Sequence, residues 1–300
     1  MVNKATMQRR GMTTGVRLFQ FFNNLFMLLL IVLMCYPLWH IVMYSLSDVS
    51  LALKGGVFLW PRGFSIETYR IVLKNRMVMS GFRVSFLVTA LGSFGAMLLT
   101  AMTAYPISRR RLRGRGPLTF LIFFTMLFSG GMVPSYLLIK ELGLIDSYAA
   151  LILPGLMSAW NILLMRNFFQ NIPDSLEESA MLDGASDPLI FARIILPVSK
   201  PVLATIFLFS AVGYWNNYFS TVLYVNRREM WSLQAVLRDI VTNASAAMAR
   251  QGVSIVEQTS TTAQTVMMAT VVIATVPILV VYPFLQKHFV QGVMIGAIKG

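Results

Sequence analysis

A short polar segment, residues 171–201, carries the residue types and spacings of this 300-residue chain that point most clearly to a function. It reads NIPDSLEESAMLDGASDPLIFARIILPVSKP and lies between long apolar runs. Pro173 suits the first turn of a helix. The acids that follow, Asp174, Glu177 and Glu178, suit the positive end of that helix. A short helix with acids on one side is suited to docking against a protein, and the alternative is a helix that lies on the lipid surface.

The same segment contains signals for a turn and for a second helix. Gly184 stands where a helix would end in a left-handed conformation. Ser186 and Asp187 precede Pro188, which is typical of a helix start. The segment is therefore predicted to fold as two short helices that meet at a glycine elbow.

The composition predicts an all-α membrane protein. Hydrophobic residues make up 56% of the chain and charged residues 12%, whereas a soluble domain has roughly 25% charged residues. The mean hydropathy is +0.68. The apolar residues cluster in runs of about 20, which is the length that crosses a bilayer as a helix. The single cysteine, Cys35, excludes an intrachain disulfide.

The positive charge follows the pattern of membrane topology. The formal net charge is +13, with basic residues gathered before the first apolar run and at 109–115. Such clusters mark the cytoplasmic ends of membrane helices and attract anionic lipid headgroups. This distribution argues against nucleic-acid binding.

Six membrane spans are predicted after a cytoplasmic amino-terminal segment, residues 1–17. The spans and the polar segment together form one predicted transmembrane domain, residues 18–300. If there are six spans, the 109–115 loop, residues 171–201 and both termini face the cytoplasm, although basic residues in the outside segment 45–81 weaken the rule. The expected spans are about 18–44, 82–107, 118–139, 147–169, 202–225 and 265–285.

Polar and aromatic residues inside two spans are candidates for a solute pathway. Trp215, Asn216 and Tyr218 lie in the fifth span, and Asn161 lies in the fourth. Rings can stack on the apolar faces of a solute, and amides can bond to its hydroxyl groups. Packing between helices, with amides bonding to neighbouring helices, is the alternative. The third span contains Gly130, Gly131 and Pro134, which indicate either a hinge or a helix bend.

The polar segment resembles the signature of ATP-binding-cassette (ABC) importer permeases, E-A-A-x3-G-x9-I-x-L-P. Only Ser179 departs from it, because that pattern has alanine there. The stretches SGGMVPSY, YWNNY and QKHFVQGVMIGAIKG resemble other parts of carbohydrate importer permeases of the maltose type, especially those of complex-oligosaccharide and polysaccharide importers. The matching positions are Glu178, Ser179, Ala180, Gly184, Ile194, Leu196 and Pro197.

The resemblance implies a coupling helix between spans four and five that receives motion from an ATPase. Glu178 would face a basic group of the ATPase, Gly184 would form the elbow, and the Ile-x-Leu-Pro residues would anchor it under the fifth span. It also implies a prokaryotic plasma-membrane complex with a second, related permease subunit and two ATPases. An extracytoplasmic binding protein, expected to be lipid-anchored, would deliver the sugar.

The chain itself is expected to have no enzymatic activity, no catalytic residues and no cofactor. It lacks the G-x4-G-K-[ST] phosphate loop, so ATP and Mg would bind to the partner ATPases. No metal site is expected, because His40 and His288 are far apart in the predicted topology. An ion- or proton-coupled secondary transporter is the alternative function. Such proteins commonly need ionisable residues within the spans, and the middle of each predicted span has none.

Overall fold

The computed structural model describes residues 14–52, 55–56, 58–250, 264–280 and 283. Residues 1–13 and most of the chain after 280 lie outside this description, and so does the end of the sixth predicted span. Within the described residues the structure is helical and has no strand beyond one isolated bridge between Ser47 and Phe64. The expectation of an all-α protein is confirmed for this part of the chain.

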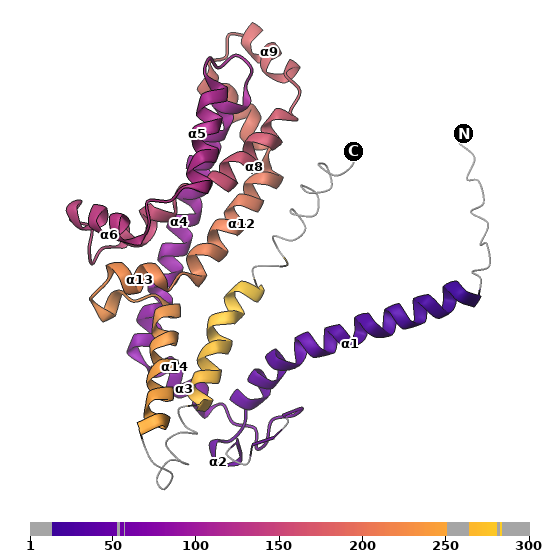
Figure 1. Ribbon diagram of the computed structural model, residues 1–300, viewed down its shortest axis with the longest axis vertical. Helices are drawn as coiled ribbons and strands as arrows, with labels where there is room; N and C mark the ends of the chain where they lie inside the picture. The colour runs from indigo at the N-terminus through magenta and orange to yellow at the C-terminus, as the bar shows by residue number, and fades with distance from the viewer. Residues whose placement is uncertain (1–13, 53–54, 57, 251–263, 281–282, 284–300) are drawn as a thin grey trace.

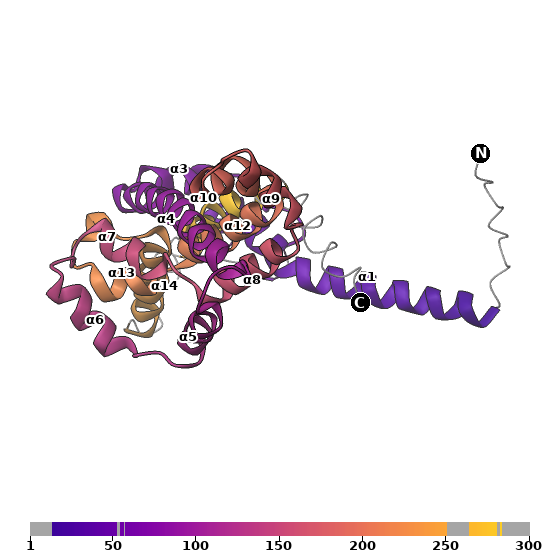
Figure 2. The ribbon, with the colours of Figure 1, turned by 90° about the horizontal axis from the view of Figure 1, so that it is seen from above.

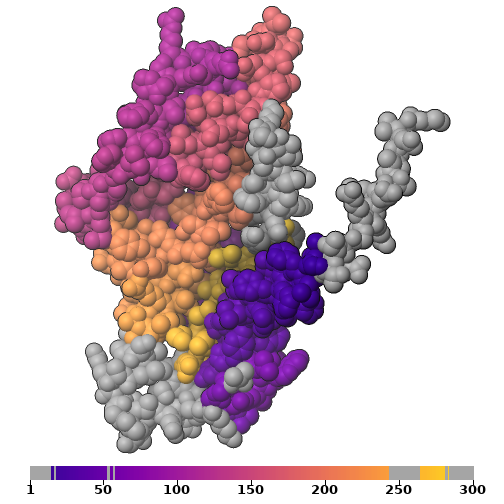
Figure 3. All heavy atoms as spheres, turned by 45° about the vertical axis from the view of Figure 1, so that its right-hand side comes forward, coloured from indigo at the N-terminus to yellow at the C-terminus, as the bar shows by residue number. Residues whose placement is uncertain are grey.

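Among the residues that the structure describes, two helices are individually long and apolar enough to cross a membrane. They are the apolar part of α1 (Thr14–Ser45), from Leu18 onward, and α4 (Arg76–Ser108). The membrane-crossing part of α1 is 0% buried, and the helix extends away from the other helices in both ribbon views (Figure 1, Figure 2). Its carboxyl end packs, where Met43 and Tyr44 cluster with Phe58 and Met268. Figure 3 shows this part of α1 in indigo beside the yellow helix Gln264–Val280. The short helices α2 (Val49–Ala52) and α3 (Glu67–Lys74) follow it.

Three other apolar segments are bent rather than straight. Helices α5 (Arg115–Leu127) and α6 (Met132–Glu141) meet at 110°. Helices α7 (Tyr148–Ile152) and η1 (Leu153–Gly155) meet α8 (Ala159–Gln170) at 49°. The segment 187–198 meets α12 (Lys200–Asn216) at 83°. If each pair counts as one span, up to five spans result, and the apolar helix Gln264–Val280 is shorter.

The third predicted span is therefore not one helix. Gly131 has a φ of 89°, which an L side chain rarely adopts, and the helix stops before it. A chain reversal of 110° is sharper than the helix bend favoured from the sequence.

The fifth predicted span also breaks, within the aromatic motif YWNNY. Helix α12 ends at Asn216, and α13 (Phe219–Tyr224) begins after two residues. The Asn217 side chain accepts from Ser220 N at 3.0 Å and donates to Ser220 Oγ at 2.8 Å, so it organises the turn. Tyr218 therefore lies between two helices and does not continue the helix that carries Trp215. The 3-10 helix η3 (Arg228–Met230) and α14 (Leu233–Arg250) follow.

Helix α4 forms the centre of the packed part, where α12, α8 and α14 lie against it. It runs from the end where α9 lies to the end where α3 and α14 lie (Figure 1). At this second end, Ser80 Oγ donates to Glu229 O at 2.5 Å, and Ser85 Oγ accepts from Leu233 N at 2.8 Å. These contacts connect α4 to the segment that follows the broken fifth span.

A loop at 142–147 is held to the segment after α13 by one carboxylate. Asp146 adopts a φ of 58° and accepts hydrogen bonds from Asn226 N at 2.6 Å and Arg227 N at 3.1 Å. The hydrogen bond from the Arg227 backbone, together with those from Asn226, holds the pKa of the Asp146 carboxyl below its usual range. The loop between two bent spans is thus fixed by local polar contacts.

Candidate functional site

The polar segment folds as two short helices at one end of the molecule (Figure 1). They are α9 (Ser175–Leu182) and α10 (Asp187–Ile190). Helix α9 begins two residues after Pro173, with Glu177 and Glu178 in its first turn. Helix α10 begins beside Pro188, as the sequence predicts.

A glycine elbow joins the two helices. Gly184 has a φ of 80°, and its N–H donates to Met181 O at 3.0 Å. The N–H of Ala185 donates to Ala180 O at 2.9 Å. These two bonds form a Schellman motif, which satisfies carbonyls at the end of α9 and requires a left-handed residue at position 184. The predicted local structure is confirmed.

The connection from α10 to α12 contains an unusual wide turn. A π-helix, η2 (Phe191–Ile195), leads into α11 (Leu196–Val198). Pro197 has no N–H, and its ring would crowd the carbonyl four residues earlier, so a regular α-helix is disfavoured there. Ile190 and Ile195 are fully buried, and their spacing of one π turn directs both into the core under the elbow.

The residues that match the family signature differ in their exposure. Glu178 and Ser179 are exposed, and the Ser179 hydroxyl donates to Ser175 O at 2.9 Å. Ala180 is half-buried, as are Ile194 and Leu196, and all three pack against the core under the elbow. Pro197 is exposed, so its visible contribution is to the backbone rather than to packing. The outward direction of Glu178 leaves its carboxylate available to a partner.

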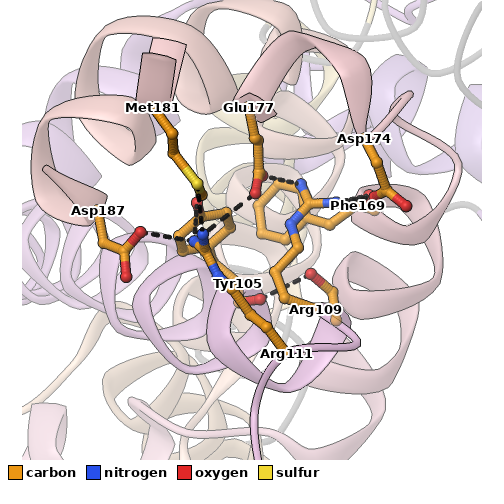
Figure 4. A network of polar contacts seen from close by, with 9 residues as sticks. Tyr105, Arg109, Arg111, Phe169, Asp174, Glu177, Met181 and Asp187 are labelled. Atoms are coloured by element: carbon orange, nitrogen blue, oxygen red, sulfur yellow. Dashed lines mark hydrogen bonds and ion pairs between the residues drawn. The ribbon is translucent and has the colours of Figure 1, made fainter. Parts of the chain in front are cut away.

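The neighbouring acid points the opposite way. Glu177 is 5% exposed, and its Oε1 lies 2.7 Å from Nη2 of Arg109, which is also 5% exposed (Figure 4). Arg109 Nη1 donates to Phe169 O at 3.2 Å and lies 3.7 Å from the Asp174 carboxylate. The guanidinium also lies 5.2 Å from the ring centroid of Tyr105. The positive charge of Arg109 at this position stabilises the negative carboxyl ends of both α4 and α8.

A second arginine spans the elbow. Arg111 Nη2 lies 2.6 Å from Oδ1 of Asp187 and 3.7 Å from Oε2 of Glu177, so it reaches both short helices (Figure 4). Its Nη1 also lies 3.2 Å from the sulfur of Met181. Arg111 is 41% exposed, so water and salt weaken its pairs more than those of Arg109.

Sequence reasoning interpreted the arginines at 109–115 only as a topology signal and did not pair them with the polar segment. Glu177 and Arg109 are separated by 68 positions, and no local pattern joins them. The signal that could have indicated the pair is the presence of two adjacent acids in one helix turn. Successive helix positions are about 100° apart, so Glu177 and Glu178 must face different surroundings.

The aromatic candidates in the fifth span contribute to helix packing. Trp215 is buried, donates from Nε1 to Ala274 O at 3.0 Å and meets Phe82 edge to face at 5.8 Å. Tyr218 lies under the Arg238 guanidinium at 4.3 Å. Asn216 is exposed, with its Oδ1 3.5 Å from Gln234 Nε2. The structure does not bring these residues together with Asn161, which is buried in the first turn of α8.

No group of three or more His, Cys, Asp or Glu residues that could hold a metal ion is found among the residues the structure describes.

Comparisons with known proteins identify the family of this chain. The family model described as "Binding-protein-dependent transport system inner membrane component" matches residues 10–295. The polygalacturonan/rhamnogalacturonan transport system permease protein YtcP of Bacillus subtilis is 44% identical, over 95% of this chain and 99% of YtcP. Protein LplC of the same organism is 41% identical over 96% of this chain and 97% of LplC.

A solved structure shows the same fold. A chain of a bacterial ABC transporter involved in the import of the acidic polysaccharide alginate superposes with a TM-score of 0.83 and 31% identity, covering 93% of this chain and 99% of that chain. The resemblance seen in the sequence is confirmed, and the ion-coupled alternative finds no support. The chain belongs to the inner membrane components of binding-protein-dependent transport systems, which are transport permeases and not enzymes.

Proposed function

We propose that this chain is one permease subunit of an ATP-driven importer and that residues 171–201 are its contact with an ATPase. The observation that carries the proposal is the opposite environment of two adjacent acids in α9. Glu177 is buried against Arg109, whereas Glu178 is exposed. The Arg109–Glu177 pair thereby fixes α9 to the rest of the chain, and the Glu178 carboxylate stays exposed to a basic partner. Gly184 would then set the angle of the surface that the ATPase meets.

The substrate class is a fragment of an acidic polysaccharide. Two similar proteins support this, since one carries polygalacturonan and rhamnogalacturonan in its name and the other takes part in alginate import. The complex would contain a second permease, two ATPases that bind ATP and Mg, and a lipid-anchored extracytoplasmic binding protein. Trp215, Asn216, Tyr218 and Asn161 remain candidates for the solute pathway, with contact to the sugar shared with or left to the second permease.

The proposed setting is a prokaryotic plasma membrane, with six spans and both termini in the cytoplasm. The count is supported by the up to five spans that the bent pairs allow, together with the shorter apolar helix Gln264–Val280. In a Cys35→Ser background, single cysteines at Ser50 and Ser245 should react with an impermeant thiol reagent on intact cells. Cysteines at Arg113, Asn171 and Lys299 should not react. Labelling at positions 113 or 171 would contradict the orientation.

The function is tested by reversing the exposed charge of α9. In the reconstituted complex, Glu178→Lys should reduce ATP hydrolysis stimulated by the loaded binding protein at least tenfold, the factor expected for a loss of about 1.4 kcal/mol of coupling. Glu229→Lys makes the same change in an exposed acid at the other end of α4, and it should have no such effect. An oligogalacturonide should stimulate hydrolysis and a neutral maltooligosaccharide should not. Wild-type stimulation in Glu178→Lys would contradict the ATPase contact.

A further inference from the structure

The two arginines that hold the polar segment come from the end of a helix that passes through the whole packed part of the molecule. We propose that Arg109 and Arg111 form an ion-pair clamp through which α4 follows the movement of α9. Both are positioning residues, since neither needs to touch solute or ATPase. The inference rests on the proposed function of residues 171–201 as the ATPase contact.

The covalent chain that leads from the carboxyl end of α9 to α12 is poorly suited to transmitting a force. It passes Gly184, around which a side chain would meet nothing within 4 Å, and then the π-helix at 191–195. It then turns by 83° between Val198 and Lys200 before α12 begins. Each of these irregularities lets the path bend instead of transmitting displacement.

Helix α4 offers a path without a break. It is one helix of 33 residues that continues through Pro106 in its last turn, and Arg109 is its carboxyl cap. The Tyr105 ring, one turn earlier, lies 5.1 Å from the Phe191 ring and 6.2 Å from the Phe169 ring. At the other end, Ser85 holds the first turn of α14 through its contact with Leu233 N. Motion of α4 would therefore reach the segments after the broken fifth span.

Burial makes the Arg109–Glu177 pair suited to this task. Packed side chains resist compression but separate easily, whereas two buried opposite charges also resist being pulled apart, because each would be left in a poorly solvated place. Arg111 also restrains the angle between α9 and α10. Since it contacts Glu177 in α9 and Asp187 in α10, opening the elbow must break one of its pairs. The clamp thus fixes α9 to α4 and also limits the elbow angle.

The test separates coupling from stability. Arg109→Gln and Glu177→Gln should leave ATPase subunits bound and hydrolysis stimulated, but reduce sugar uptake per ATP hydrolysed on the order of tenfold. The matched control is Arg110→Gln, which removes an exposed arginine of the same loop, and its ratio should equal that of the wild type. The double variant Arg109→Gln/Glu177→Gln leaves no unpaired buried charge, so it should assemble even where a single variant does not. Its uptake per ATP should still be low.

An unchanged ratio of uptake to hydrolysis in the double variant would overturn the clamp, whatever the amount of complex recovered. A purely structural ion pair would lower the yield and leave this ratio unaltered. Glu178→Lys distinguishes the two proposals. If it abolishes stimulated hydrolysis while the Arg109 and Glu177 variants keep a normal ratio, the ATPase contact holds and only the clamp is wrong. If it has no effect, the ATPase contact is wrong and the clamp falls with it.

Discussion

Replacing Gly184 by valine is expected to abolish binding-protein-stimulated ATP hydrolysis while the chain still inserts into the membrane. The residue has a φ of 80°, and both hydrogen bonds that end α9 depend on that conformation. A strained left-handed residue costs about 1–3 kcal/mol, and a β-branched side chain resists it most. A Cβ at this position would meet nothing within 4 Å, so the effect comes from backbone conformation and not from a clash. The elbow would open and remove Glu178 from its partner.

Gly184→Asn provides the matched control for this experiment. Asparagine tolerates the left-handed region better than other residues with a side chain, so stimulated hydrolysis should stay within a few-fold of the wild type, given the small cost expected there. Hydrolysis is measured on purified complex, normalised to the amount of ATPase bound. Equal activity of the valine and asparagine variants would show that the elbow conformation does not matter for coupling.

The elbow itself was predictable from the sequence because every contact that defines it is local. Pro173, Gly184 and Pro188 restrict the backbone by their own chemistry, and the structure has the expected helix–elbow–helix form. The clamp was not predictable in the same way. It depends on the carboxyl end of α4 lying next to α9, which is a result of packing the whole bundle.

The spans show the same limit. Hydropathy locates apolar segments well, since α1 and α4 closely follow the first two predictions. It carries no information about direction, so it merged helices that meet at 110° and at 49° into single spans. Glycine and proline at 130, 131 and 134 indicated an irregularity, but its angle depends on contacts with other helices. The break after Asn216 was harder to predict. Asn217 organises it through its side chain, but an asparagine in an apolar span can also bond to a neighbouring helix.

The junction of α4, η1 and α12 is formed around one tyrosine and two glycines. The Tyr214 ring is buried, and its hydroxyl donates to Ile152 O at 2.7 Å. A Cβ on Gly92 would lie 2.6 Å from Tyr214 Cζ, and one on Gly155 would lie 2.8 Å from its Oη. The ring is therefore confined between the backbones at Gly92 and Gly155. Its hydroxyl donates to the Ile152 carbonyl, close to the point where the fourth span bends.

Gly92→Ala is expected to destabilise this junction strongly. Alanine in a helix interior would normally gain about 1 kcal/mol over glycine, whereas overpacking against a rigid ring costs about 1–3 kcal/mol or more. The second effect should dominate because the hydroxyl bond prevents the ring from moving away. Gly213→Ala is the control, since its Cβ would meet nothing within 4 Å, and it should keep or slightly raise the melting temperature of the purified complex. Adding Tyr214→Leu to Gly92→Ala removes the ring and should recover much of the lost melting temperature. A Gly92→Ala variant that melts at or above the wild-type temperature would show that the junction can shift, and that the close contact does not hold the bend in place.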